Sequence, residues 1–165
     1  MVPTPDSSMN IPAANHSGQG LRISIVVARF NSEVTGGLLD GAVATLLAAG
    51  VARKDIAVHA TAGAVELPLS CDLLIAREKP NAVIALGAVI RGATDHYEHV
   101  ARLAAEGLMQ VMLRTRIPVA FGVLTCATDA LALERSRDDN HNKGREAALA
   151  ALELANLARA PHPLP

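Results

Sequence analysis

Short apolar runs alternate along this chain with longer segments of helical periodicity, and no other feature constrains its fold as strongly. The runs are rich in Val, Ile and Ala and almost continuously hydrophobic, as is typical of strands covered on both faces. They span residues 21–30, 55–60, 81–90 and 117–125. Apolar residues at helical spacing occupy the segments between and after the runs, over residues 31–50, 66–79, 95–115, 129–137 and 143–159. Because this alternation requires a parallel sheet with helices on both faces, the sequence predicts an α/β protein, a flavodoxin-like three-layer α/β/α sandwich with a four-stranded parallel sheet.

The length of the chain, 165 residues, is that of one ordinary domain. We expect this domain over residues 21–159. Residues 1–20 are rich in Pro, Ser, Asn and Gly, and residues 160–165 are rich in Pro, which is typical of a flexible arm and a flexible tail. The arm of a neighbouring subunit could extend the sheet.

Charge and cysteine content narrow the class of protein. The formal net charge of −1 provides no broad basic surface, so neither nucleic acid nor an anionic membrane is an expected partner. No apolar stretch approaches the ~18 residues of a membrane span, and the N-terminal residues lack the basic and apolar regions of a secretory signal. Cys71 and Cys126 lie far apart and form no CxxC pair, which predicts buried thiols in a reduced, cytoplasmic protein.

Parallel sheets bind ligands beyond the carboxyl ends of their strands, so the residues that follow the predicted strands are the first candidates for a site. The stretch NAVIALGAVIRGATDHYEHV, residues 81–100, changes from apolar to polar after Ile90. Gly92–Thr94 allows a tight turn, and a helix from about Asp95 presents N–H groups that attract an anion such as phosphate. Spacing alone favours an ordinary turn in which Thr94 or Asp95 caps the helix.

His96 and Glu66 are the titratable candidates at these strand ends. An imidazole in a first helical turn suits proton transfer near neutral pH, whereas an HxxH pair with His99 is weak support for a metal site without a third ligand. Glu66 follows a glycine turn, where it either binds hydroxyl groups of a ligand or only stabilises the start of a helix.

Two phenylalanines are present, and each lies at or near the end of a predicted strand. Phe30 directly precedes a helix start that Asn31 or Ser32 can cap, and Phe121 lies inside the fourth apolar run. From the residues alone, packing against other apolar side chains is favoured for both rings over stacking on a ligand.

The segment ERSRDDNHNKG, residues 134–144, gathers Arg135, Arg137 and Lys143. One interpretation is a solvated loop in which Asn142 caps the last helix. The other is a phosphate site in which the guanidinium of Arg135 binds two oxygen atoms at once.

In their order and amino-acid sequence, five segments closely resemble the motifs of one family: ARFN, GAVELP, ALGAVIRGATDHYEHV, FGVLT and ERSRDDNHNKGREAALAALELANL. The chain is similar to lumazine synthases over about residues 21–159. The resemblance implies the condensation of 5-amino-6-(D-ribitylamino)uracil with 3,4-dihydroxy-2-butanone 4-phosphate to 6,7-dimethyl-8-ribityllumazine, a step of riboflavin biosynthesis. It implies neither a metal nor an organic cofactor.

The resemblance also assigns roles to the residues that match the family's motifs. Phe30 would stack on the pyrimidine, and His96 would donate and accept protons. The same subunit would also form the ribityl site (Ala64, Val65, Glu66), the pyrimidine pocket (Ala88, Val89, Ile90) and the phosphate site (Ala93, Thr94). A neighbouring subunit would complete the active site with Phe121, Arg135 and Lys143.

Self-association follows from the same resemblance, because the family's active site lies between two subunits. Its members form pentamers, pairs of pentamers or sixty-subunit shells, and we expect a pentamer-based assembly. Three positions depart from the family's usual sequence motifs: Ala62, Val65 and Asp95. They leave open a paralogue that binds lumazine or flavin with little synthase activity. A structural shell subunit and a flavodoxin-type electron carrier are further alternatives, since a fold alone does not imply a function.

Overall fold

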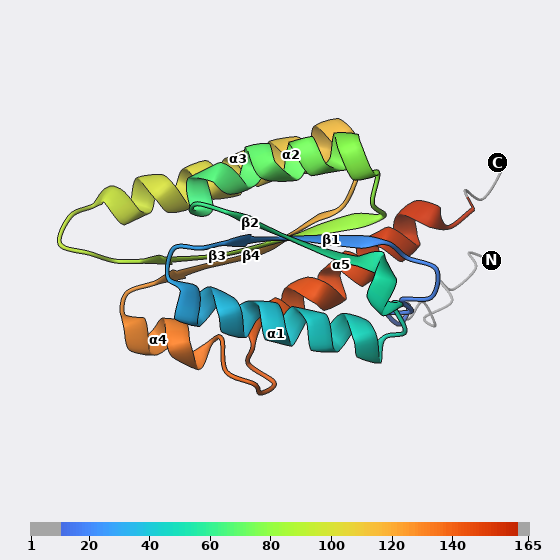
Figure 1. Cartoon of the computed structure of the whole chain (residues 1–165), viewed down its shortest axis with the longest axis horizontal. Coiled ribbons are helices and arrows are strands. Elements are labelled where there is room, and N and C mark those ends of the chain that lie inside the picture. Colours follow the sequence, from blue (N-terminus) through green and yellow to red (C-terminus); the bar gives the residue numbers. More distant parts are fainter. Residues whose placement is uncertain (1–10, 162–165) are drawn as a thin grey trace, which may run out of the picture.

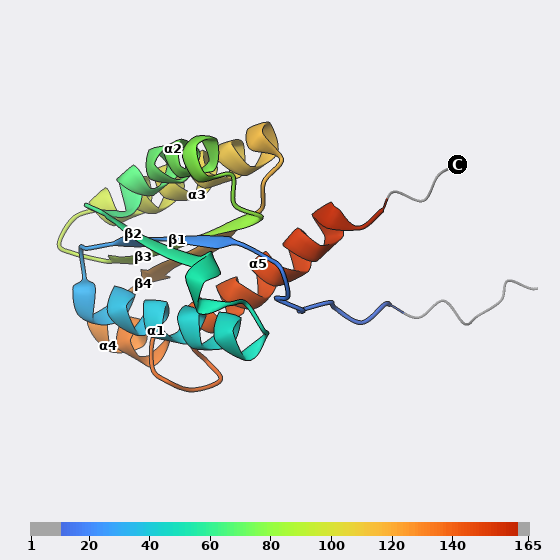
Figure 2. The same ribbon diagram turned by 45° about the vertical axis from the view of Figure 1, so that its right-hand side comes forward.

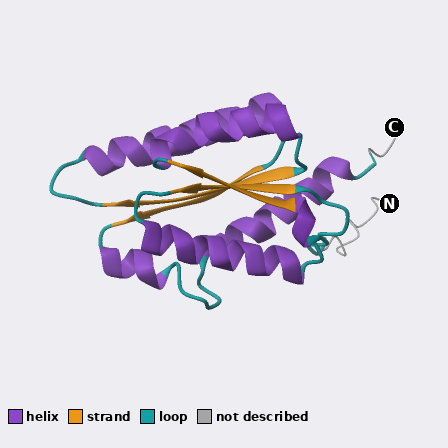
Figure 3. Ribbon diagram, viewed as in Figure 1, coloured by secondary structure: helices purple, strands orange, loops and turns teal. Residues whose placement is uncertain are grey.

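A four-stranded parallel sheet forms the centre of the computed structural model, which describes residues 11–161. The strand order is β2-β1-β3-β4, and Figures 1 and 3 show the sheet nearly edge on between layers of helices. The strands are β1 (Ile23–Ala28), β2 (Ile56–Thr61), β3 (Ala82–Ile90) and β4 (Val119–Cys126). Each lies within or next to a run that the sequence predicts as a strand.

Helices cover both faces of this sheet, which confirms the predicted three-layer α/β/α sandwich. One layer consists of α1 (Ser32–Ala48), α4 (Asp129–Glu134) and α5 (Lys143–Arg159). The opposite layer consists of α2 (Leu67–Glu78) and α3 (His96–Thr115), as Figures 1 and 2 show. Two short 3₁₀ turns, η1 (Arg53–Asp55) and η2 (Ala64–Glu66), flank β2.

Local sequence signals explain where the helices begin and end. Helix α1 ends at Ala48, shortly before Gly50, and α2 carries Pro68 in its first turn, where no intrahelical donor is lost. Asn142 is the N-cap of α5, and its side chain accepts a hydrogen bond of 3.1 Å from the Arg145 N–H. The interpretation of Asn142 as the cap of the last helix is confirmed.

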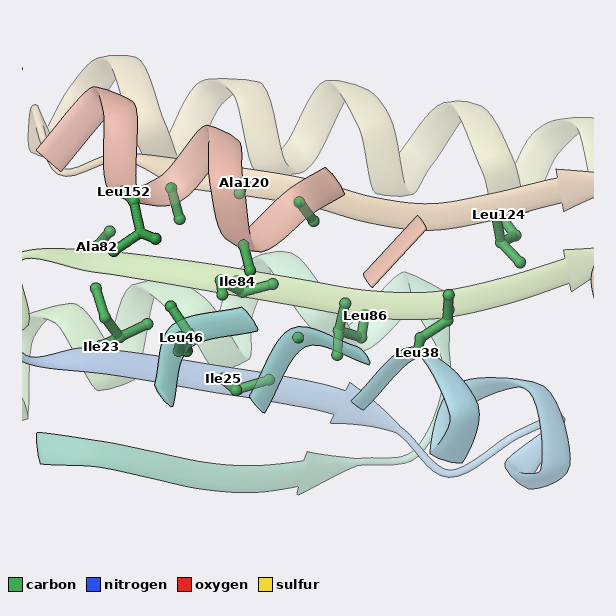
Figure 4. Packing of buried hydrophobic residues seen from close by; sticks show 14 of the residues in the cluster. Ile23, Ile25, Leu38, Leu46, Ala82, Ile84, Leu86, Ala120, Leu124 and Leu152 are labelled. Carbon is green, nitrogen blue, oxygen red and sulfur yellow. The ribbon is translucent and has the colours of Figure 1, made fainter. Parts of the chain in front are cut away.

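The larger part of the core lies between the sheet and the α1–α5 layer. Figure 4 shows Ile25 and Leu86 of the strands facing Leu38 of α1, with Leu152 of α5 in the same cluster, and all four side chains are almost fully buried. On the other face, Val26 packs in a second cluster that α2 and α3 cover. The strands are therefore apolar on both faces, which accounts for their near-continuous hydrophobic runs.

The buried stripes of the helices are narrower than the sequence predicts. Helical spacing places Leu47 of α1 and Leu103 of α3 on the apolar side of their helices, but 39% and 52% of their surfaces are exposed. Four of the five buried residues of α1 are spaced four apart, Val34, Leu38, Ala42 and Leu46, and Leu47 lies beside that line. Helical period alone does not determine the width of a packed stripe.

Part of the predicted arm is bonded to its own chain. The Asn156 Nδ2 group donates hydrogen bonds of 3.0 Å to the Asn15 carbonyl and 2.9 Å to the Ser17 carbonyl, and Arg159 donates one of 2.9 Å to the Gln19 carbonyl. Residues 15–19 thus lie along the C-terminal half of α5. The predicted domain boundary at residue 20 stays a prediction, and residues 1–10 and 162–165 lie outside the described part.

Both cysteines are free and buried, as predicted. Burial, with a smaller contribution from the charge of Asp72, raises the pKa of the Cys71 thiol to about 12. In the described part of the chain, no helix combines the length and the apolar character needed to cross a bilayer.

Candidate active site

A cleft opens at the carboxyl edge of the sheet because β3 continues beyond the strand beside it. The last paired residues of β1 and β3 are Val27 and Leu86, whereas β3 and β4 stay paired as far as Ile90 and Cys126. Residues 88–90 therefore have β4 on one side and no strand on the other. Since β1 has β2 on one side and β3 on the other, this is the topological switch point at which α/β sheets bind ligands.

The cleft has a volume of about 350 Å³ and brings together most of the residues predicted for the site. Its lining includes the following of them: Phe30, Ala64, Val65, Glu66, Ala88, Val89, Ile90, Thr94 and His96. They come from the ends of three strands and the start of α3, segments that are distant in the sequence. Ala93 is exposed in the same loop but is not part of the lining.

Phe30 is held at the mouth of the cleft with its ring in solvent. Of its surface, 71% is exposed, so the favoured prediction of a core aromatic was wrong. The Phe30 N–H donates to the Ala62 carbonyl at 3.1 Å, which extends the β1–β2 ladder to the ring. The next residue, Asn31, has a left-handed backbone (φ 59°), and its Nδ2 donates to the Ala88 carbonyl at 2.8 Å rather than capping α1. These two bonds fix the ring beside β3.

The loop before α3 carries the polar end of the cleft. The Thr94 hydroxyl accepts a hydrogen bond of 3.4 Å from the His96 N–H, and the imidazole of His96 is exposed to the cleft. Asp95 occupies the N-cap position without a side-chain capping bond and is not part of the lining. The guanidinium of Arg91 lies 5.7 Å from the ring centre of Tyr97, a cation–π contact that connects both ends of the loop.

Glu66 ends the η2 turn directly before α2. It occupies the N-cap position of α2, but its side chain makes no capping hydrogen bond, while Ala64 two residues earlier is buried. The carboxylate lines the cleft and is exposed. Glu66 therefore lies both in the cleft and at the start of α2, so the two predictions made for it, binding of ligand hydroxyl groups and stabilisation of the helix start by its charge, stay predictions.

A second cleft, of about 390 Å³, lies along β4 and the start of α5. Phe121 and Lys143 line it, and it shares no lining residue with the first cleft. Phe121 is 48% exposed, so the prediction of a core residue was wrong here as well. Alternation along β4 places Phe121 on the face that carries Val119 and Val123; these two are buried in the second cluster, but that cluster does not extend to Phe121, and its ring stays exposed.

The backbones of Arg135 and Lys143, the first and last residues of a loop, are in contact. The Lys143 N–H donates to the Arg135 carbonyl at 2.9 Å. Burial raises the pKa of the Cys126 thiol at the end of β4, and the nearby positive charge of Arg135 opposes part of that rise. Arg135 lines neither cleft, and Lys143 forms an ion pair with Glu146 at 2.7 Å.

The clefts contain further residues that were not predicted as site residues. Among them, Tyr97 and Val100 line the first cleft and Glu146 lines the second, while Asn31, outside both linings, donates a hydrogen bond to the Ala88 carbonyl. Tyr97 is the chain's single tyrosine and follows His96, and Glu146 lies one helical turn after Lys143. These two sequence features could have drawn attention to Tyr97 and Glu146, but neither feature shows that the residue lines a cleft unless the fold is known.

Metal ligands do not cluster in the described part of the chain. No group of three or more His, Cys, Asp or Glu side chains in residues 11–161 is arranged to hold a metal ion. The first cleft instead offers apolar walls from β3, the aromatic side chains of Phe30 and Tyr97, one carboxylate, one imidazole and the N-terminus of a 20-residue helix. That set of groups suits a flat ligand with hydroxyl groups and an anionic end.

Comparison with known families agrees with this geometry. Residues 20–159 match the model of a family described as 6,7-dimethyl-8-ribityllumazine synthase. The match covers both clefts and every element of the sandwich.

Proposed function

The chain belongs to the 6,7-dimethyl-8-ribityllumazine synthase family, and on that premise we propose that it condenses 5-amino-6-(D-ribitylamino)uracil with 3,4-dihydroxy-2-butanone 4-phosphate. The observation that carries the proposal is the gathering of Phe30, Glu66 and His96 in one cleft at the switch point of the sheet. The products are 6,7-dimethyl-8-ribityllumazine, inorganic phosphate and water.

The pyrimidine substrate would enter the first cleft with its ring against Phe30. The apolar wall of residues 88–90 would cover the ring's edge, because these residues have no β1 neighbour. The ribityl chain would then lie toward η2, where the Glu66 carboxylate accepts hydrogen bonds from hydroxyl groups and the backbone at Ala64 and Val65 offers further polar groups.

The phosphate group of the second substrate would bind at the start of α3. Thr94 and Ala93 lie in the loop there, and the first N–H groups of α3 carry the positive end of the helix dipole. Arg135 would add a guanidinium that binds two phosphate oxygens at once, and Lys143 would add a point charge.

His96 would transfer the protons of the reaction. The pyrimidine amine attacks the ketone carbon and gives a carbinolamine, which loses water to form an imine. Elimination of phosphate follows, and the second amine then attacks the remaining carbonyl, closing the ring with loss of a second water; each step moves at least one proton. An imidazole at this position, one residue from the N-cap of α3, reaches the cleft in which these steps would occur.

Binding both substrates together would supply most of the rate enhancement. Correct orientation of two reactants is worth roughly 7–11 kcal/mol in well-aligned model reactions, whereas a general acid or base contributes ~10²–10⁴-fold. Most of the residues in the cleft therefore have a binding role.

We further propose that each active site is completed by a second subunit. Phe121 and Lys143 line a cleft of their own, so one chain carries the two halves of a site at different places. Association of chains would bring the β4 cleft of one subunit to the β1–β3 cleft of the next. A pentamer-based ring would close this head-to-tail contact.

Mixing both substrates with the purified protein tests the proposed reaction. We expect the fluorescent lumazine to form together with one equivalent of inorganic phosphate. Phe30→Ala serves as a site variant, and Leu157→Ala, an exposed residue near the end of α5, serves as the matched control. Binding of the lumazine without turnover by the wild-type protein would contradict the proposal and favour a binding paralogue.

A further inference from the structure

A buried asparagine lies between the two cationic residues of the proposed phosphate site. Asn142 is only 1% exposed, and its side chain uses both of its polar atoms. Its Nδ2 group donates to the carbonyls of Gly37 at 3.0 Å, Ser136 at 3.0 Å and Arg137 at 2.9 Å, and its Oδ1 atom accepts from the Arg145 N–H at 3.1 Å. One amide group thus connects three segments of the chain.

These hydrogen bonds determine the course of the backbone between Arg135 and Lys143. Ser136 and Arg137 follow the guanidinium-bearing residue directly, and both of their carbonyls are bound by Asn142. The Lys143 N–H closes the loop by donating to the Arg135 carbonyl at 2.9 Å. The side chains of Arg135 and Lys143 therefore project from the same hydrogen-bonded loop, although seven residues separate them in the sequence.

Helix α1 has a glycine, Gly41, where the Asn142 side chain packs against it. A Cβ atom at Gly41 would lie 2.7 Å from the Asn142 Nδ2 atom, closer than real contacts allow. Any larger residue at position 41 would displace the amide. The close approach also lets the Gly37 carbonyl, one turn earlier on α1, accept from Asn142.

We propose that Asn142 is a positioning residue for phosphate recognition: it sets the spacing between the Arg135 guanidinium and the Lys143 ammonium so that both meet one phosphate group. This inference rests on the proposed function, because it takes these two cations as the phosphate ligands. Long flexible side chains lose conformational entropy when they bind, and a fixed backbone at their base reduces the number of arrangements that must be lost.

The same helix provides a matched control. Asn156, near the other end of α5, is also buried, with 5% exposed, and its Nδ2 group donates to three carbonyls, those of Asn15, Ser17 and Leu152. It lines neither cleft and lies far along α5 from Lys143. Replacement of either asparagine removes an amide with a comparable set of hydrogen bonds.

The experiment compares Asn142→Ser, Asn142→Asp and Asn156→Ser by steady-state kinetics. Both replacements of Asn142 keep an oxygen that can cap α5 but remove the amide that binds the carbonyls. We expect KM for the butanone phosphate and the inhibition constant of inorganic phosphate to rise by about tenfold or more, since a displacement of ~1 Å can cost ~10²-fold. KM for the pyrimidine should stay unchanged in these variants, and Asn156→Ser should leave all three constants unchanged.

A fourth variant, Gly41→Ala, displaces the Asn142 amide without removing any hydrogen-bonding group and should raise the same two constants. Equal effects of Asn142→Ser and Asn156→Ser, or a rise in both substrate KM values, would overturn the inference while leaving the proposed reaction in place. Absence of product with the wild-type protein would overturn the proposed function and this inference with it.

Discussion

His96 is the residue of the first cleft to which we assign proton transfer, and its replacement would separate chemistry from binding. We expect His96→Ala to lower kcat by ~10²–10⁴-fold, the usual contribution of a general acid or base. Turnover should remain measurable, because Phe30 and Glu66 still hold the substrates. His99→Ala is the control, since His99 is exposed on the same helix but outside the lining. A folded His96→Ala protein with no residual turnover would contradict this assignment.

Asp95 places a negative charge at the N-cap of α3, beside the proposed phosphate site. Its carboxylate makes no capping hydrogen bond, so replacement by asparagine removes charge without removing a bond. A charge at a helix terminus is worth about 0.3–1 kcal/mol. We therefore expect Asp95→Asn to lower KM for the butanone phosphate by about twofold to fivefold. Asp40→Asn, an exposed change on α1 away from both clefts, should leave KM as it is.

At this scale, the sequence predicted which residues matter better than it predicted their surroundings. The ends of the predicted strands and the family's motifs led to Phe30, Glu66 and His96, which do share a cleft. The exposure of Phe30 and Phe121 was not predictable from their apolar neighbours. For Phe30 it depends on where β1 ends relative to β3, and these segments are distant in the sequence.

Among the elements, the edge strand β2 is tied to α2 and β1 through the carboxylate of Glu78. It accepts hydrogen bonds from Arg77 at 2.6 Å and Ser24 at 3.1 Å, and it lies 3.1 Å from His59 Nε2. The Arg77 bond is the main reason that the pKa of Glu78 lies below its ordinary value of 4.5, with Ser24 and His59 contributing and partial burial opposing.

The lowered pKa of Glu78 predicts a pH dependence of stability. The folded state binds this proton less well than the unfolded chain, so Glu78 stabilises the fold above its unfolded pKa near 4.5, and this contribution is lost as the pH falls below that value. Glu78→Gln should lower the free energy of unfolding at pH 7 and change it little at acidic pH, measured by urea denaturation. Glu106→Gln, at an exposed position of α3, should show no such difference between the two pH values.

Helices α1 and α5 approach so closely that a methyl group at Gly144 would overlap the Leu38 carbonyl. We expect Gly144→Ala to lower the free energy of unfolding by about 1–3 kcal/mol, as overpacking of a core usually does. Gly36→Ala on α1 provides the opposite control. A Cβ atom there meets nothing within 4 Å, and alanine favours a helix over glycine by about 1 kcal/mol. The two glycine changes should therefore shift thermal unfolding in opposite directions.

Most element boundaries were predictable to within a few residues because glycine, proline and asparagine mark them. Gly50 follows the end of α1, Pro68 lies in the first turn of α2, and Asn142 caps α5. The core-facing width of each helix was not predictable, as Leu103 shows with 52% of its surface exposed. The width of the buried face depends on how closely the helix packs against its neighbours. The periodicity of one segment carries no information about that packing.

For the whole molecule, the proposed shared site requires association, and the surface is consistent with it. Leu69 and Leu73 of α2 and Leu113 of α3 are each more than half exposed. We expect light scattering to give a mass of five chains or a multiple of five, with 17.1 kDa for each chain. A monomer that retains full synthase activity at high dilution would contradict the shared site.

The layers of the sandwich could be derived from the alternation of strands and helices, because parallel strands allow few connections. The separation of Phe30 from Phe121 could not, since it results from the sheet order β2-β1-β3-β4. That order puts the end of β1 and the outer edge of β4 on opposite sides of β3.

The two clefts without a common lining residue also carry a consequence for inheritance. In the proposed shared site, an allele that damages His96 would disable one half, and an allele that damages Lys143 would disable the other half. A cell with both alleles would assemble mixed rings in which some junctions join two intact halves. Two alleles that are each recessive and inactive alone would therefore restore growth together, whereas two alleles that damage the same cleft would not.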